Sequence, residues 1–321
     1  MSAVIVTDKL CKSFRGKRVV DELSIIVPQG AIYAWLGDNG AGKSTTIRML
    51  TGLLPPDAGS ASIRDVDCWS GATQLRHNVG YVPEKPKLYD WMTVAETGWF
   101  AAGFHKPGYL PRYEECVARF RLTPDAKLKT LSKGGYAKVG LALALAGDPE
   151  VLILDEPTSG LDLFTRREFL GSMVDMAGAG KTILISSHGV AEIERVASHA
   201  AFIANGKLVM AGNVEELRKR ILRVRLRCTE TPPDANHFGK VLDRTTAGPQ
   251  WQAILQDPDR IALDSLVHRA GIYDYEEAQL NLEEMYTALF GRLHETLPAE
   301  RASQNGEARA EPVAQAAEGL P

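Results

Sequence analysis

One run of consecutive residues has the types and spacing needed to bind phosphate. Gly37-Asp38-Asn39-Gly40-Ala41-Gly42-Lys43-Ser44-Thr45 matches the pattern G-x-x-x-x-G-K-[S/T]. Its glycines allow the backbone to curl so that successive N–H groups point at phosphate oxygens. Lys43 can then contact the β- and γ-phosphates, and the Ser44 hydroxyl can bind Mg²⁺. The run therefore predicts a nucleoside-triphosphate site.

A second segment supplies carboxylates that would complete such a site. A run of aliphatic residues leads into Asp155 and Glu156. In phosphoryl-transfer sites an Asp at this position holds Mg²⁺, and Glu156 is then left to polarise a water. Two other apolar segments, Val79 to Glu84 and Thr182 to His188, also end in a polar side chain. Because ligands bind beyond the carboxyl ends of parallel strands, these polar residues are expected to share one site.

The elements that must position these residues follow an α/β pattern. A short apolar strand, Ala31 to Leu36, precedes the phosphate-binding run, and a helix from about Lys43 to Thr51 follows it. β-Branched residues between 4 and 27 predict strands with a turn near 15–17. Asn205-Gly206 predicts the turn of a hairpin over 200–211. Residues 86–146 lack strand alternation and predict a helical insertion, with helices at 93–102, 113–120 and 135–146.

From about residue 218 the pattern changes. Leu222 to Cys228 alternates apolar residues with arginines, which predicts a half-buried strand with a basic outer face. Trp251 to Leu255 predicts another short strand. Asn281 is expected to cap a last helix that carries apolar residues on one face. Beyond Glu295 large apolar side chains are almost absent, so a disordered tail is expected over 295–321.

Composition excludes several other classes of protein. The 321 residues include 45% hydrophobic ones, which is typical of a globular chain of about two domains. The 37 Lys and Arg are balanced by 40 Asp and Glu, which argues against a non-specific nucleic-acid binder. No apolar run approaches the length of about 20 residues that a membrane-spanning helix needs. Four scattered cysteines favour reduced thiols in a cytoplasmic protein.

Several further motifs occur in a characteristic order. Leu131-Ser132-Lys133-Gly134-Gly135 resembles an LSGGQ signature, and Ser159-Gly160-Leu161-Asp162 resembles a D-loop. His188 resembles a switch histidine, and Phe14 matches an aromatic residue that stacks on adenine. With the two phosphate-site motifs, residues 4–215 resemble the ATP-binding subunit of an ABC transporter, of the exporter-like group with a separately encoded permease.

This resemblance implies an architecture and a working assembly. The fold would be a P-loop NTPase cassette with a mixed central sheet, an N-terminal antiparallel part, a helical insertion and a small α+β C-terminal extension. The expected domains are a cassette over 1–217, with its helical subdomain at 86–146, a C-terminal domain over 218–294 and the tail. Partners would be membrane permease subunits and a second ATPase subunit in a head-to-tail dimer, held at the inner face of the membrane.

The resemblance also implies roles for individual residues, with ATP and Mg²⁺ as cofactors. The catalytic residues would be Glu156, His188 and Lys43, and the metal ligands Ser44, Asp155 and Glu84. The nucleotide would contact a larger set: Phe14, Gly37, Asn39, Gly40, Ala41, Gly42, Lys43, Ser44, Thr45, Glu84, and the signature and D-loop residues Ser132, Gly134 and Asp162. Trp91, Trp99 and Phe100 lie where such subunits receive the permease. Core packing of the helical insertion explains each of them singly, and as a cluster they support the hypothesis of a docking groove.

Two departures from the family pattern leave alternatives open. Glu84 stands where a glutamine is usual, and Lys133 and Gly135 alter the signature. One alternative is therefore a regulatory or degenerate ATP-binding module that is not coupled to transport. Independently of these departures, another alternative is a soluble family member that acts on DNA or ribosomes. The balanced charge and the short interval between the two phosphate-site motifs disfavour the second alternative.

Overall fold

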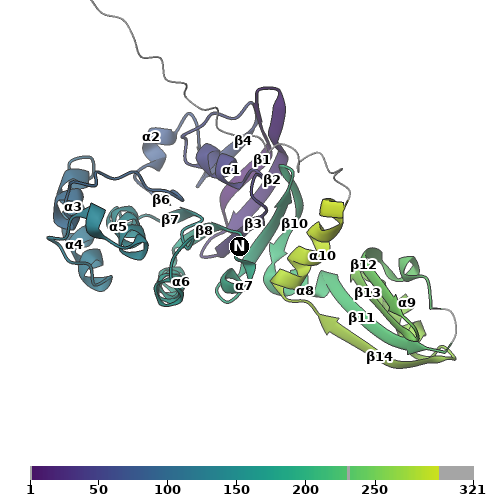
Figure 1. The fold of residues 1–321 in the computed structure, drawn as a ribbon. Helices are drawn as coiled ribbons and strands as arrows, with labels where there is room; N and C mark the ends of the chain where they lie inside the picture. Colours follow the sequence, from purple (N-terminus) through teal and green to yellow (C-terminus); the bar gives the residue numbers. More distant parts are fainter. Residues whose placement is uncertain (1, 230–231, 296–321) are drawn as a thin grey trace, which may run out of the picture.

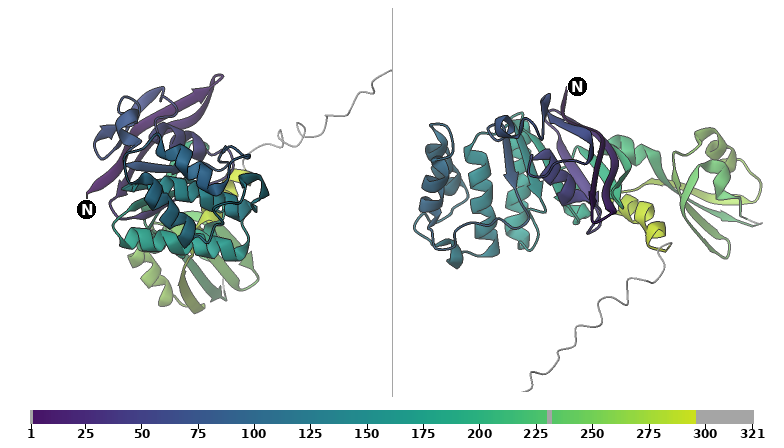
Figure 2. Two further views of the ribbon diagram at one scale, coloured as in Figure 1. Left: turned by 90° about the vertical axis from the view of Figure 1, so that its left-hand side faces the viewer. Right: turned by 90° about the horizontal axis from the view of Figure 1, so that it is seen from above.

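The computed structural model describes residues 2–229 and 232–295. All of the expected tail except Glu295 lies outside these residues. The described chain contains three sheets, with helices packed around the central one (Figure 1). The helical insertion and the C-terminal sheet lie at opposite ends of the molecule (Figure 2). The predicted fold class, a P-loop NTPase cassette with a small α+β extension, is confirmed by this architecture.

The central sheet has six strands in the order β10-β9-β3-β8-β7-β6. Five of them run parallel, and β10 pairs antiparallel with β9, so the sheet is mixed as expected. Asn205 and Gly206 both have positive φ and form the predicted turn between β9 and β10. The strands are β3 (Ile32–Gly37), β6 (Val79–Val82), β7 (Val151–Asp155), β8 (Thr182–Ser187), β9 (His199–Ala204) and β10 (Lys207–Asn213).

The other two sheets are antiparallel. The N-terminal sheet has the order β2-β1-β4-β5, and the C-terminal sheet the order β12-β13-β11-β14. The first comprises β1 (Ala3–Phe14), β2 (Lys17–Pro28), β4 (Ala58–Ile63) and β5 (Val66–Asp67). The second comprises β11 (Ile221–Cys228), β12 (Lys240–Ala247), β13 (Gln250–Gln256) and β14 (Ile272–Gln279).

The helices of the insertion fall near their predicted positions. They are α3 (Val94–Ala102), α4 (Tyr109–Arg119), the 3₁₀ turn η1 (Leu128–Thr130) and α5 (Lys133–Ala146). Helix α4 begins four residues before its predicted start, because Pro111 sits in its first turn, where no intrahelical N–H is required. The remaining helices are α1 (Lys43–Leu50), α2 (Ala72–Leu75), α6 (Leu163–Gly178), α7 (Val190–Ile193), α8 (Val214–Arg220), α9 (Arg260–Val267), α10 (Leu282–Glu295) and the 3₁₀ turn η2 (Ala235–Phe238).

Strand β3 is buried on both faces and separates two hydrophobic cores. Tyr33 and Trp35 face a core shared with β1, β2 and α1. Ile32, Ala34 and Leu36 face a second core, which extends through α5 and α6 to α10. Burial on both faces explains why the parallel strands read as continuous apolar runs. Because the strands are buried along their length, their polar residues lie at the strand ends.

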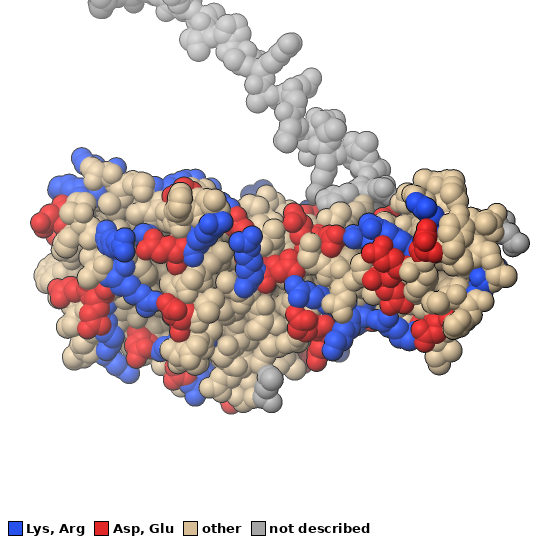
Figure 3. All heavy atoms as spheres, turned by 90° about the horizontal axis from the view of Figure 1, so that it is seen from below, with Lys and Arg blue, Asp and Glu red and all other residues tan. Residues whose placement is uncertain are grey.

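The surface of the molecule carries charges of both signs. On the face shown in Figure 3, cationic and anionic side chains are interspersed over the whole length of the chain. This distribution matches the balanced overall charge. Within the described ranges, no helix is both long and apolar enough to cross a bilayer.

Candidate nucleotide site

The phosphate-binding loop connects β3 to α1, as the sequence predicts. Gly40 and Gly42 adopt φ values of +82° and +102°, which only glycine adopts without strain. A Cβ at Gly42 would lie 2.7 Å from the Val19 carbonyl oxygen. Gly37 has an ordinary φ, but a Cβ there would lie 2.4 Å from the Ile203 carbonyl oxygen. Backbone conformation requires two of the three glycines, and close packing requires the third.

The helix that follows the loop begins without a side-chain cap. Gly42 is the N-cap residue of α1 and offers no side chain to the first N–H groups of the helix. Those groups, with the positive end of the helix dipole, form a site for an anion. Asn39 and Gly40 lie exposed at the tip of the loop, Ala41 is buried beneath it, and Ser44 and Thr45 lie in the first turn of the helix.

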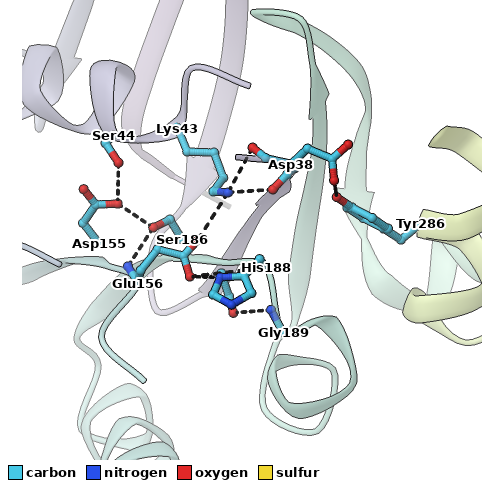
Figure 4. Close-up of polar contacts among 11 residues, drawn as sticks. Asp38, Lys43, Ser44, Asp155, Glu156, Ser186, His188, Gly189 and Tyr286 are labelled. Carbon is cyan, nitrogen blue, oxygen red and sulfur yellow. Dashed lines mark hydrogen bonds and ion pairs between the residues drawn. The ribbon is translucent and has the colours of Figure 1, made fainter. Parts of the chain in front are cut away.

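Lys43 is a buried cation at the centre of the site. Its side chain is 6% exposed, and its Nζ donates a hydrogen bond of 2.6 Å to the Gly37 carbonyl oxygen. The same Nζ lies 3.2 Å from Glu156 Oε1. A buried charge needs such partners because burial removes its hydration. The ion pair places the ammonium between the phosphate loop and the end of β7 (Figure 4).

A hydrogen bond joins Ser44, in the first turn of α1, to Asp155, at the end of β7. Ser44 Oγ donates to Asp155 Oδ1 at 3.0 Å, and Ser186 Oγ donates to the same oxygen at 2.7 Å. Hydroxyl and carboxylate oxygens of this kind are the ligands that Mg²⁺ prefers in proteins. Burial, with the Asp155 charge adding to it, raises the pKa of neighbouring Tyr81 to about 12, so that phenol stays neutral.

Glu156 lies between the lysine and the histidine. Its Oε2 lies 2.7 Å from His188 Nδ1, and the His188 backbone N–H also donates to it. Within the described residues its Oε1 accepts no hydrogen bond, although it faces Lys43. Glu156 has a φ of +49°, a conformation that non-glycine residues seldom adopt and that often occurs at functional sites. The Glu156 N–H is fixed by Ser186, whose carbonyl and hydroxyl oxygens lie 3.2 and 2.9 Å away.

The structure thus brings together Lys43, Ser44, Asp155, Glu156 and His188. Sequence reasoning missed Ser186, which joins the two carboxylate residues. The only sequence signal for it was its place at the end of a buried strand, directly before Ser187 and His188.

Several predicted residues lie outside this group. Strand β6 ends at Val82, so Glu84 sits two residues beyond it, exposed and 3.9 Å from Lys85 Nζ. Phe14, at the end of β1, is 45% exposed, and Lys12 Nζ lies 5.8 Å from its ring centroid. An exposed aromatic face of this kind can stack on another flat ring.

The signature and D-loop residues begin two other helices. Ser132 is exposed and caps α5 by accepting a hydrogen bond from the Gly135 N–H, while Gly134 is buried against Thr165. Asp162 caps α6 by accepting from the N–H groups of Phe164 and Thr165. The Thr165 hydroxyl and these N–H groups hold the pKa of Asp162 below its usual range. None of the described contacts joins these residues to Lys43 or Glu156 of the same chain.

Comparison with known proteins places this site in a family. A profile of the family described as "ABC transporter" matches residues 20–159. The bacitracin transport ATP-binding protein of Bacillus licheniformis is 38% identical over 224 residues, covering 68% of this chain and 73% of that protein. The daunorubicin/doxorubicin resistance ATP-binding protein of Streptomyces peucetius is 30% identical over 328 residues, covering 97% and 98%.

A solved structure gives the same result. An ATP binding subunit of an ABC transporter matches with a TM-score of 0.62 and 30% identity, over 67% of this chain and 92% of that one. The resemblance drawn from the motifs is therefore confirmed, and the chain belongs to the family of ABC transporter ATP-binding proteins.

Proposed function

We propose that this chain binds Mg²⁺-ATP and hydrolyses it to drive export through separate membrane permease subunits. The observation that carries the proposal is the group formed by the phosphate loop, the buried Asp155 and Glu156, and the exposed His188 that contacts Glu156. It supplies a cation for phosphate, oxygen ligands for a metal and a carboxylate for a water. Export is supported by the drug-resistance relative, whose similarity extends through the C-terminal region as well as the cassette.

The described residues fit a triphosphate with one metal ion. Lys43 and the open N–H groups of α1 would hold the phosphates. Ser44 and Asp155, whose oxygens already lie 3.0 Å apart, would bind Mg²⁺, which neutralises the charge that develops during phosphoryl transfer. Glu84 would add a further oxygen from the segment after β6. Phe14 would stack on the adenine ring.

Glu156 would act as the general base. Its Oε1 is buried and forms an ion pair with Lys43 Nζ, but it accepts no hydrogen bond from the described residues, so it can accept one from a water. His188 holds the other oxygen and thereby orients the carboxylate. The ion pair with Lys43 balances the charge of this buried carboxylate and holds it in the site.

A second subunit would complete the site. Ser132 is exposed at the start of α5 and has no described contact with the phosphate loop of its own chain. In a head-to-tail dimer it would meet ATP held by the partner, and Asp162 would lie close to the same interface. Hydrolysis would remove the γ-phosphate that links the two chains and loosen the dimer.

An exposed aromatic cluster would receive the permease at the inner face of the membrane. It consists of Tyr89, Trp91, Phe100 and Phe104, whose rings form a chain of contacts with centroid separations of 5.4–5.9 Å. All four rings are exposed, and Trp99, which is 70% exposed, lies on the same helix as Phe100. Core packing therefore does not account for these residues, and contiguous exposed apolar surface marks an interaction site.

The substitution Glu156→Gln tests the proposal. Glutamine keeps the size of the side chain and an oxygen toward His188, but it cannot take a proton from water. Loss of a general base lowers the rate by about 10²–10⁴-fold. We expect phosphate release to fall by that factor, while ATP binding remains and ATP now traps a dimer detectable by size-exclusion chromatography.

The matched control is Glu168→Gln, which changes an exposed carboxylate on α6 that pairs with Lys138. It should hydrolyse ATP at the wild-type rate. If the wild-type protein hydrolyses ATP no faster than Glu156→Gln, the proposed ATP hydrolysis that drives export is refuted. A regulatory ATP-binding module is then the better account.

A further inference from the structure

The last described helix reaches back to the phosphate loop. The Tyr286 hydroxyl of α10 donates a hydrogen bond to the Asp38 carboxylate, across 248 positions of sequence. Figure 4 shows this carboxylate pointing toward Tyr286 rather than toward Lys43. Asp38 is the first residue after β3 and lies inside the loop that would hold the phosphates.

Helix α10 is held firmly enough to place the Tyr286 hydroxyl. Its first turn is fixed by a capping box, in which the Glu284 N–H donates to Asn281 Oδ1 and the Asn281 N–H donates to Glu284 Oε2. The Leu282 N–H donates to Glu194 Oε1 at 3.0 Å, which attaches the helix next to α7. The Tyr286 ring packs on Phe290 with centroids 4.5 Å apart.

The main chain and the side chain of Asp38 face different partners. Its carbonyl oxygen accepts from the Ala41 N–H at 3.1 Å and lies 3.4 Å from Lys43 Nζ, so it helps to shape the loop. Its carboxylate is directed to α10. A carboxylate turned toward bound phosphates would repel them, because like charges a few ångströms apart in a partly buried site interact strongly.

We propose that Tyr286 is a positioning residue that holds the Asp38 carboxylate away from the bound phosphates, so that the C-terminal helix sets the affinity for nucleotide. The inference rests on the proposed ATP binding. It gives the C-terminal extension a direct part in the nucleotide site of its own chain.

The chemistry of the pair agrees with this role. Burial, together with the hydrogen bond to Asp38, raises the pKa of Tyr286 above its ordinary value. The phenol therefore stays protonated at neutral pH and remains a donor. A phenol that donates to a carboxylate also stabilises the charge on that carboxylate where it lies, outside the phosphate site.

The test is a double-mutant cycle read by equilibrium binding of Mg²⁺-ATP and Mg²⁺-ADP to the full chain. Tyr286→Phe removes only the hydroxyl and should raise the Kd for ATP about fivefold, the equivalent of one ordinary hydrogen bond. Asp38→Asn removes the charge and should bind ATP somewhat more tightly than wild type. In the Asp38→Asn background, Tyr286→Phe should change the Kd by less than about twofold, because no carboxylate remains to be held.

A matched control separates this effect from a general loss of stability. Tyr275→Phe removes another phenol of the C-terminal region that donates to a carboxylate, that of Glu277. It should leave the Kd for ATP unchanged. An unchanged Kd in Tyr286→Phe would overturn the inference, and so would an equal loss of affinity with and without Asp38, which would indicate packing instead. Failure of the wild-type chain to bind ATP would instead refute the proposed function.

Discussion

Ser186→Ala is the change that most directly probes how the site is built. The Ser186 side chain is fully buried, and its hydroxyl bridges the two carboxylate residues. Alanine removes the donor to Asp155 and one acceptor for the Glu156 N–H. In the variant the Glu156 N–H can still donate to the Ser186 carbonyl oxygen, which lies 3.2 Å away. The main interaction lost is therefore the hydrogen bond to Asp155.

The expected magnitude follows from these contacts. A hydrogen bond to a charged group contributes about 1.5–3 kcal/mol, so the free energy of unfolding should fall by about 2 kcal/mol. Removal of a residue that orients a metal ligand typically weakens metal binding about 10–100-fold. The Mg²⁺-dependent gain in ATP affinity should therefore fall by about tenfold or more.

Two measurements on the same protein check both parts. Urea unfolding without nucleotide gives the stability, and the Kd for ATP with Mg²⁺ and with a chelator gives the metal-dependent gain. The control is Ser187→Ala, which removes another buried hydroxyl; among the described residues it accepts a hydrogen bond from the Gly189 N–H alone. It should cost about 1 kcal/mol and leave the metal-dependent gain intact. The reasoning fails if both variants lose that gain equally, or if neither does.

Two further predictions concern the outer surface and the last helix. Trp91→Ala should weaken permease binding and permease-stimulated ATPase activity, whereas Trp69→Ala, at a similarly exposed tryptophan beside α2, should not; co-purification with the permease measures the difference. The Asn281 N–H and Arg223 lower the pKa of Glu284 in the folded state. The contribution of the Glu284 carboxylate to the free energy of unfolding is therefore complete above its unfolded pKa of about 4.3. It is lost as the pH falls through the pKa of Glu284 in the folded state. Urea midpoints between pH 7 and 3 should fall further in wild type and in Glu283→Gln than in Glu284→Gln.

Much of this site was predictable because it is built from local patterns. The strand, loop and helix around Lys43 are contiguous in sequence, and a buried parallel strand exposes polar residues only at its end. Asp155, Glu156 and His188 were placed together for that reason alone. The family resemblance then assigned them roles that the sequence pattern could not.

The elements and contacts that the sequence did not predict are those determined by their position in the tertiary fold. Strands β12 and β14 lie at the two edges of their sheet, so β14 is largely polar and lacks apolar alternation. Helix α6 was not predicted, and its cap, Asp162, was read only as part of a motif. The contact between Tyr286 and Asp38 joins residues so distant in sequence that only the tertiary fold reveals it.

The shared core has a consequence for synthesis of the chain. Phe290 and Met285 of α10 belong to the same core as Leu36 and Phe202 of the central sheet. Domains made on the ribosome generally fold from the N-terminus as they emerge. Here Phe202 of β9 packs against Tyr286 and Phe290, so this part of the core is completed only when α10 has left the exit tunnel. A translational pause before residue 290 would leave this part of the central core exposed, so the timing of α10 synthesis would decide when the core beside the phosphate loop is complete.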